Sequence, residues 1–217
     1  DLDLFQVKSD SIWLFRNDSG SFVEVAASLG LSSVGSYKAS VWFDYDGDGD
    51  LDLHVANYGQ VDSLYRNDAG VMTPVGVTTM TTASSYSFGG SWGDYDGDGD
   101  PDLYVVNTAA NALYRNDGGV LTLLSGVAAD ASSGRGATWG DYDDDGDLDL
   151  YVTNYSGTNV SNVLYRNDGS DAFVDVSSGA GVASTLASYA ASWVDYDGDG
   201  LLDLYVANYF GRANQLY

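Results

Sequence analysis

The chain contains no cysteine, two prolines and one histidine, and its 32 Asp and Glu residues far outnumber its 8 Lys and Arg residues. Without cysteine, neither a disulfide framework nor a thiolate metal site is possible. Two prolines are too few to mark a disordered linker. The formal net charge of -24 argues against a nucleic-acid or anionic-membrane partner. These shortages therefore favour a cation as the partner.

Long apolar runs are also missing, since no stretch of about 18 apolar residues and no charged-then-apolar signal segment occurs. The first residue falls inside a repeat, so we expect either a removed leader or a piece of a longer protein. Helix formers such as Glu, Lys and Gln are scarce, whereas Gly, Ser, Ala, Thr, Tyr and Val dominate. The composition predicts one all-β domain over residues 1–217, with a sizeable core.

What the chain does contain is an acidic nonapeptide, Asp-Tyr-Asp-Gly-Asp-Gly-Asp-Pro-Asp in its second copy, which recurs about every 50 residues. The copies are residues 44–52, 94–102, 141–149 and 195–203. The tail of a fifth copy opens the chain at residues 1–4. Everything else is spaced around these acidic loops.

Each period holds four short runs typical of β-strands, named A to D here. Run A precedes the acidic loop, and its small residues predict a crowded location; it covers residues 38–43, 88–93, 136–140 and 190–194. Run B follows the loop and is apolar on both faces, which predicts cover on both sides; it covers residues 53–57, 103–107, 150–154 and 204–208.

Runs C and D complete the period. Run C carries the repeated Leu-Tyr-Arg-Asn-Asp motif or its Leu-Phe variant, at residues 14–18, 64–68, 113–117 and 164–168. Its Asn-Asp pairs, followed by glycine, are typical of hairpin turns with positive φ. Run D contains Pro74, Glu24 and Asp175 and is predicted to be an edge strand; it covers residues 22–25, 72–75, 121–124 and 173–176.

Four strands in about 50 residues match the dimensions of a propeller blade, with a hairpin solenoid as the alternative. We therefore predict a β-propeller of four-stranded antiparallel blades, about five blade equivalents in all. Three blades are complete, the first lacks run A and the last lacks run D, which makes 18 strands. The expected boundaries are a partial blade at 1–36, blades at about 37–86, 87–134 and 135–186, and a partial blade at 187–217.

The acidic loops have the chemistry of a metal site. Each offers carboxylates at positions 1, 3, 5 and 9, a glycine at position 6 and a backbone carbonyl at position 7, where the fourth copy has a leucine. Oxygen-only ligands at alternating positions suit a hard cation of calcium's size. The predicted ligands are Asp44, Asp46, Asp48, Asp50, Asp52, Asp94, Asp96, Asp98, Asp100, Asp102, Asp141, Asp143, Asp145, Asp147, Asp149, Asp195, Asp197, Asp199, Leu201 and Asp203.

Other occupants of these loops are less favoured. Mutual repulsion of four carboxylates, roughly 1 kcal/mol per pair at about 4 Å in water and several-fold more near a protein surface, argues against a solvated turn without an ion. Magnesium prefers fewer protein ligands and strict octahedral geometry, and an EF-hand would need a glutamate at position 12 and flanking helices. We therefore expect four calcium ions for each chain.

Several other residues invite a functional interpretation. We predict that the tryptophans two residues before each loop pack between neighbouring sheets; they are Trp42, Trp92, Trp139 and Trp193. His54, the only histidine, occupies a place where the other repeats have tyrosine, so a catalytic role is disfavoured. The run C arginines form either an anion-binding patch or, as we expect, ion pairs with nearby carboxylates; they are Arg16, Arg66, Arg115 and Arg166.

These motifs resemble the FG-GAP and VCBS repeats of integrin α-subunit propellers and of secreted bacterial proteins, especially the variety found in cartilage acidic protein and its bacterial relatives. The resemblance rests on the four acidic loops, on the Asp-Leu-Tyr-Val runs after two of them, on the run C motif and on Phe88-Gly89-Gly90-Ser91. Only this last copy spells Phe-Gly. The resemblance implies a calcium-binding β-propeller outside the cell, with each ion between the innermost strand A and strand B.

The incomplete end blades leave two possibilities: the chain is a segment of a longer protein, or neighbouring molecules complete the blades. The function that we favour is a non-catalytic extracellular calcium-binding module for structure, adhesion or ligand binding. The alternatives are a self-assembling subunit of a fibre or surface layer, and a lectin-like protein with sugars between blades near Tyr58, Tyr155 and Tyr209. No acid-base or nucleophilic constellation suggests an enzyme. We expect no nucleic-acid partner and no membrane insertion.

Overall fold

The structure is a computed structural model, which describes residues 1–8, 10–31, 35–75, 86–126, 128, 133–155 and 160–217. The described residues form β-strands and one three-residue 3-10 helix, η1 (Ala27–Leu29). No helix in this part of the chain has the length and apolar character needed to cross a membrane. The all-β prediction is therefore confirmed.

The described strands make five antiparallel sheets, each of sequence neighbours. The first has three strands, β1 (Leu4–Lys8), β2 (Ser11–Asp18) and β3 (Ser21–Glu24). The second has β4 (Tyr37–Phe43), β5 (Asp52–Asn57), β6 (Ser63–Asp68) and β7 (Val71–Pro74). The third has β8 (Ser87–Gly93), β9 (Asp102–Asn107), β10 (Ala112–Asn116) and β11 (Leu121–Leu124).

The fourth sheet contains β12 (Gly134–Gly140), β13 (Asp149–Asn154), β14 (Val163–Asn167) and β15 (Phe173–Asp175). The last has three strands, β16 (Ser188–Val194), β17 (Asp203–Asn208) and β18 (Gln215–Leu216). The described residues thus contain 18 strands, as predicted, with A to D in sequence order across each complete sheet. The D strands lie at sheet edges, which confirms that part of the prediction.

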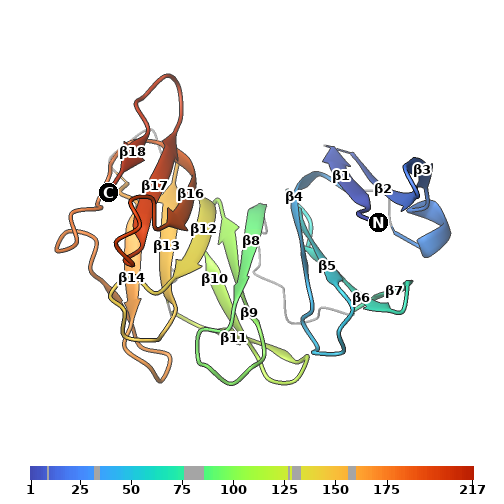
Figure 1. The fold of residues 1–217 in the computed structure, drawn as a ribbon, viewed down its shortest axis with the longest axis horizontal. Helices are drawn as coiled ribbons and strands as arrows, with labels where there is room; N and C mark the ends of the chain where they lie inside the picture. Colours follow the sequence, from blue (N-terminus) through green and yellow to red (C-terminus); the bar gives the residue numbers. More distant parts are fainter. Residues whose placement is uncertain (9, 32–34, 76–85, 127, 129–132, 156–159) are drawn as a thin grey trace.

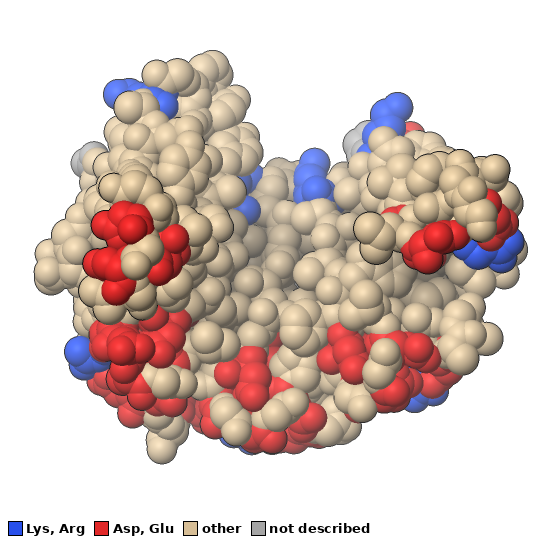
Figure 2. Space-filling view, viewed as in Figure 1, with Lys and Arg blue, Asp and Glu red and all other residues tan. Residues whose placement is uncertain are grey.

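The five sheets follow one another along an arc, with the first and last sheets at its two ends (Figure 1). The A strands of successive sheets contact one another, β4 with β8, β8 with β12, and β12 with β16. The space-filling view shows a hollow between the two ends of the arc (Figure 2). The sheets have the form of propeller blades, but they make an open arc rather than a closed ring.

The core lies between successive sheets, and the tryptophans of the A strands pack there. Trp92 stacks on Phe43 of the preceding sheet at 6.0 Å between ring centroids, and Trp139 stacks on Tyr95 at 6.1 Å. A Cβ on Gly93 would lie 2.8 Å from the ring of Trp139, so only glycine fits beneath that indole. The predictions of packing tryptophans and of a crowded strand A are confirmed.

The B strands are the buried centre of the complete sheets. Every residue of β5, β9 and β13 is buried, because a neighbouring sheet covers each face. In β17, at the end of the arc, Tyr205 is 41% exposed, whereas its equivalents Tyr104 and Tyr151 are fully buried. Burying one such aromatic or aliphatic side chain is worth about 1.5–3 kcal/mol, so the B strands supply much of the stability.

Two details of the hairpins and the A strands correct the sequence predictions. The positive φ angles of the C–D turn fall after the Asn-Asp pair, at Ala69 (50°) and Gly70 (88°), while Asn67 and Asp68 belong to β6. The A strands begin before the predicted residues, and each has a β-bulge at its second residue, for example between Tyr37 and Ala39. The bulges re-aim one side chain in each sheet.

Candidate metal centre

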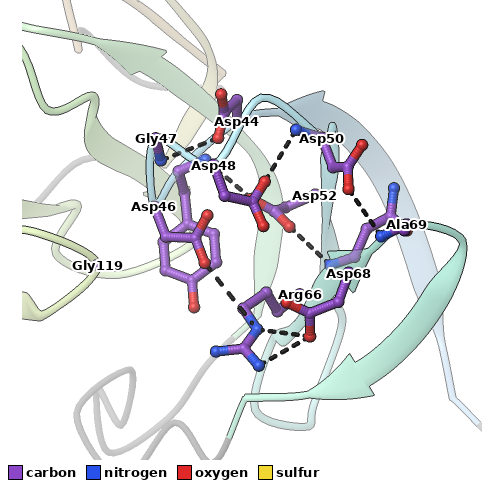
Figure 3. A network of polar contacts seen from close by, with 12 residues as sticks. Asp44, Asp46, Gly47, Asp48, Asp50, Asp52, Arg66, Asp68, Ala69 and Gly119 are labelled. Carbon is purple, nitrogen blue, oxygen red and sulfur yellow. Dashed lines mark hydrogen bonds and ion pairs between the residues drawn. The ribbon is translucent and has the colours of Figure 1, made fainter.

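The first acidic loop connects β4 to β5 and is closed by its own carboxylates (Figure 3). Asp44 accepts hydrogen bonds from the backbone N–H groups of Gly47 and Gly49, each at 2.9 Å. Both glycines have positive φ, 74° and 96°, which lets the backbone coil around the first aspartate. The loop therefore curls its carboxylates toward a common centre.

Three carboxylates meet in each of the four loops, with one oxygen from each residue lying within 4.8 Å of the others. The first and fourth loops gather positions 1, 3 and 5, and the second and third gather positions 1, 3 and 9. The clusters are Asp44, Asp46 and Asp48; Asp94, Asp96 and Asp102; Asp141, Asp143 and Asp149; and Asp195, Asp197 and Asp199. Together they use the four side-chain positions that the sequence predicts as ligands.

Asp46 carries the most informative oxygen of the first loop. Its Oδ1 is buried and has no hydrogen-bond partner. Burial, followed by the charge of neighbouring Asp48, raises the pKa of the Asp46 carboxyl. A buried carboxylate oxygen without a donor is costly unless a cation satisfies it. The donor set, oxygen atoms alone in a tight loop with a glycine at its sharp turn, fits a hard divalent ion such as calcium.

The aspartate at position 9 connects the loop to strand C. Asp102 is fully buried and accepts hydrogen bonds from the backbone N–H groups of Tyr95 and Asn116, both at 2.9 Å. Burial raises the pKa of Asp102 to about 7, and burial likewise raises the pKa of Asp149 to about 6. This aspartate therefore holds the start of the loop against strand C, a role that the sequence pattern did not reveal.

The aspartate at position 7 turns its side chain outward. Asp50 accepts from the backbone N–H of Ala69 at 2.7 Å (Figure 3). Asp100 accepts from the backbone N–H of Gly118 at the same distance. Each carboxylate thereby holds the C–D turn of its own sheet. This leaves the backbone carbonyl as the group that position 7 can offer an ion, in line with the leucine at position 201.

Strand C supplies a clamp between sheets that the sequence did not reveal. The buried side-chain amide of Asn116 donates to the carbonyl of Tyr45, in the loop of the preceding sheet, at 2.6 Å, and to that of Pro101 at 2.9 Å. Asn167 donates in the same way to Tyr95, at 2.8 Å. The repeated Asn of run C was the available signal, and we assigned it to a turn.

The run C arginines form ion pairs with the aspartate two residues later. Arg166 Nε lies 2.6 Å from Asp168 Oδ1, and Arg66 Nη2 lies 2.8 Å from Asp68 Oδ2. Arg16 and Arg115 pair with Asp18 and Asp117. The expectation of structural ion pairs is confirmed, although these exposed pairs add little stability.

His54 is buried in the interior of the second sheet. Its Nε2 lies 3.2 Å from Asp62, and its ring meets Trp92 edge-on at 6.4 Å between centroids. A Cβ on Gly90 would lie 2.9 Å from the imidazole, so the next sheet closes over it. The structure thus places His54 as a packing residue between two sheets.

The acidic side chains gather in patches along one side of the arc, from one end to the other (Figure 2). The four three-carboxylate clusters all belong to loops between an A and a B strand, so the fold repeats one acidic site along a single side. Mutual repulsion within each cluster is large at these separations. A bound divalent cation would relieve this repulsion.

Comparison with known proteins supports the repeat. A family model described as an FG-GAP-like repeat matches residues 1–55, 44–105, 94–152 and 141–206. Among curated proteins, none matches the chain. A solved structure that describes specific recognition of non-reducing terminal N-acetylglucosamine by an Agrocybe aegerita lectin is similar, with a TM-score of 0.58 and 15% identity over 94% of this chain and 57% of that one. The chain thus spans little more than half of that protein, and the likeness concerns the fold. The four matches cover almost all residues, and the chain belongs to the FG-GAP-like repeat family.

Proposed function

We propose that this chain is a non-catalytic, calcium-binding propeller-like module that works outside the cell as a structural, adhesive or ligand-binding unit. The observation that carries the proposal is the buried Oδ1 of Asp46, which lacks a donor in a cluster of three carboxylates. The same loop occurs four times, so four calcium ions are expected.

Calcium would act here as a clamp on the turn from strand A to strand B. Position 1 already accepts backbone N–H groups inside the loop, and position 9 holds the start of the loop and strand C. An ion bound to both would join these contacts and offset the repulsion among the carboxylates. Folding and metal binding are then coupled, because the unfolded chain has no such cluster.

The proposal includes the absence of catalysis. The only histidine is buried against Trp92, and the clustered carboxylates belong to the metal loops. An extracellular location follows from the proposed cation, because calcium sites of modest affinity fill at the millimolar concentrations found outside cells.

Native mass spectrometry with a chelator series tests the proposal. We expect four calcium ions for each chain and a large fall in melting temperature on chelation. Free calcium at about 100 times the dissociation constant of one site adds about 2.7 kcal/mol to the free energy of unfolding. Unchanged stability after exhaustive chelation, or a chain that retains no calcium, would refute the proposal.

Matched variants locate the ions. Asp46→Asn should remove one calcium ion and leave the other three, because repeats couple mainly to their neighbours. Asp50→Asn is the control in the same loop, since the Asp50 carboxylate accepts from Ala69. This control should keep four ions. Loss of an ion from Asp50→Asn but not from Asp46→Asn would show that we have assigned the wrong carboxylates.

Carbohydrate binding is a second candidate. It is supported by the similar solved structure, which is described as a lectin that recognises terminal N-acetylglucosamine. It is also supported by tyrosines on the side of the sheets away from the acidic loops, of which Tyr58 is 38% exposed and Tyr189 45%. A screen of immobilised glycans in calcium buffer tests it, and binding to none of them would remove this candidate.

A further inference from the structure

The four bulges at the start of the A strands bring one side chain from each sheet to the same structural position. The bulge lies between Tyr37 and Ala39 in β4, and at the equivalent step in β8, β12 and β16. The residues at these bulges are Lys38, Phe88, Arg135 and Tyr189. The A strands that carry these residues contact one another in order, and the guanidinium of Arg135 contacts the rings of both Phe88 and Tyr189.

Tyrosines at the ends of the B strands extend this row. Tyr58 directly follows β5, and its ring lies 5.6 Å from Phe88. Tyr155 follows β13 and lies 5.8 Å from Tyr189, while Tyr209 follows β17 and lies 4.9 Å from Tyr189. Aromatic rings thus form a nearly continuous band over four sheets, opposite the acidic loops.

Arg135 lies in the middle of this band. Its guanidinium lies 3.5 Å from the centroid of Phe88 and 4.6 Å from that of Tyr155, with Tyr189 at 5.9 Å. The Nε is buried and has no hydrogen-bond partner. A planar guanidinium held between rings keeps its N–H fork in a fixed orientation, ready for a bidentate acceptor such as a carboxylate.

The state of Arg135 differs from that of the run C arginines. Arg16, Arg66, Arg115 and Arg166 each pair with an aspartate. Among the described residues, no carboxylate forms an ion pair with Arg135, although the chain carries 32 acidic residues. In the space-filling view, some Lys and Arg atoms lie in the hollow, apart from the acidic patches (Figure 2).

We propose that Arg135 and the aromatic band around it bind a saccharide that bears a carboxylate, such as a terminal uronic or sialic acid residue. The N–H fork of the guanidinium would donate to the carboxylate. The exposed ring of Tyr189, and that of Phe210, which lies 4.1 Å from Tyr209 between centroids, would pack against the apolar face of the sugar. This inference deepens the ligand-binding part of the proposed function and rests on it.

The charges favour a single acidic sugar over an acidic polymer. The molecule has a formal net charge of -24, so a polyanion would be repelled, whereas one carboxylate can be placed on the one cation that the band holds between its rings. Lys38 lies farther along the band, 4.8 Å from the centroid of Tyr58, and adds a second positive charge at a distance from the first. Acidic peptides offer the carboxylate without the apolar sugar face.

The test measures binding of the calcium-loaded protein to four probes by isothermal titration calorimetry. The probes are the methyl glycosides of glucuronic acid and of N-acetylneuraminic acid, free N-acetylglucosamine, and an acetylated tri-aspartate peptide. We expect binding of at least one acidic glycoside, and which of the two binds identifies the source of the carboxylate. The methyl ester of that glycoside should bind at least tenfold more weakly.

Variants tie the binding to the site. Arg135→Gln should weaken the acidic glycoside at least tenfold, and Arg135→Lys, which keeps the charge but not the fork, should weaken it less. Arg166→Gln is the control, because Arg166 pairs with Asp168 on the acidic side, and it should bind as the unchanged protein does. Melting temperature and calcium content are measured for every variant, so a folding defect is recognised.

The outcomes are separable. Equal binding by the unchanged protein and Arg135→Gln, binding of N-acetylglucosamine or of the peptide alone, or binding of no probe by calcium-loaded protein would each overturn the inference and leave the calcium proposal intact. A chain that binds no calcium but still binds the acidic glycoside through Arg135 would refute the calcium proposal alone.

Discussion

In the four sheets that contain an A strand, one end carries the acidic loop and the other carries the bulge, and the side chains repeat at the first end but not at the second. At the acidic end, the same residues recur in the loops. The aspartate at position 1 accepts from the backbone of its own loop, and the aspartate at position 9 accepts from the backbone N–H of position 2, as in Tyr95 N–H to Asp102. At the bulged end, the backbone repeats but the side chains differ, namely Lys38, Phe88, Arg135 and Tyr189.

This difference teaches how the fold divides its tasks. A turn that binds the same ion in each sheet needs the same ligands each time, so its residues repeat. A surface that recognises one asymmetric ligand needs different groups at equivalent places. Substitutions at the acidic end should therefore change stability, whereas substitutions at the bulged end should change binding.

The largest stability effect should come from the clamp between sheets. Asn116→Ala leaves the buried carbonyls of Tyr45 and Pro101 without their donor, at about 1–3 kcal/mol for each unsatisfied group. In Asn67→Ala the equivalent amide loses only an exposed contact to Leu51. Urea unfolding should show the first variant to be clearly less stable than the second, and equal midpoints would contradict the clamp.

A smaller loss is expected under the tryptophan of the next sheet. Gly93→Ala would place a Cβ 2.8 Å from the Trp139 ring, and such overpacking costs about 1–3 kcal/mol. Gly89→Ala is the control, because its nearest contact, Ala39 Cβ at 3.7 Å, is ordinary. Thermal unfolding with both variants in calcium buffer compares them. A control as unstable as Gly93→Ala would mean that strand A tolerates no side chain here.

The acidic end should also show a pH dependence in chelator. Burial raises the pKa of Asp102 to about 7 and that of Asp149 to about 6, from a usual value of 3.8. The folded state then binds these protons more tightly than the unfolded state, so stability is highest at low pH within this window and falls as pH rises from about 4 to about 7. Melting temperatures in chelator should decrease across this range, and an increase would contradict the assigned burial.

Calcium should reverse this trend. Its ligands must be deprotonated, so its affinity, and with it the stabilisation, should increase as pH rises through the same window. Melting temperatures measured at fixed free calcium would show the crossing of the two curves. Parallel curves with and without calcium would show that Asp102 and Asp149 do not bind the ion.

The smallest stability effect should come from the bulged end. Arg135→Gln and Lys38→Gln remove cations that contact aromatic rings but form no ion pair within the described part of the chain, so their melting temperatures should fall only slightly. Differential scanning calorimetry tests both variants. A fall as large as that of Asn116→Ala would show that the bulged end supports the fold, which would erase the contrast between the two ends.

The sequence predicted the strand pattern and the position of the acidic loops, because both depend on local rules. Alternation in run B and the acidic spacing of the loops are visible within nine residues or fewer, and the structure has the strands and the carboxylate clusters at those places. Calcium itself stays a prediction, as do the extracellular location and the absence of catalysis.

Contacts between sheets were not predictable in the same way. Asn116 and Tyr45 lie 71 residues apart, and the Asn-Asp pair favours a turn when only its neighbours are considered. The bulges were missed because their residues share no chemical type, so no pattern marks them. Only a backbone register shift reveals that Lys38 and Arg135 are equivalent.

The sequence alone therefore determined the repeat, the order of strands in each sheet and the carboxylates that can hold a cation, since these follow from the side chains of one short segment. The tertiary structure decided that an oxygen of Asp46 is left buried without a donor, that Arg135 forms no ion pair among the described residues, and which rings surround Arg135. The physical reason is that burial and the absence of a partner depend on neighbouring sheets. A segment of the chain does not carry that information until the sheets have packed together.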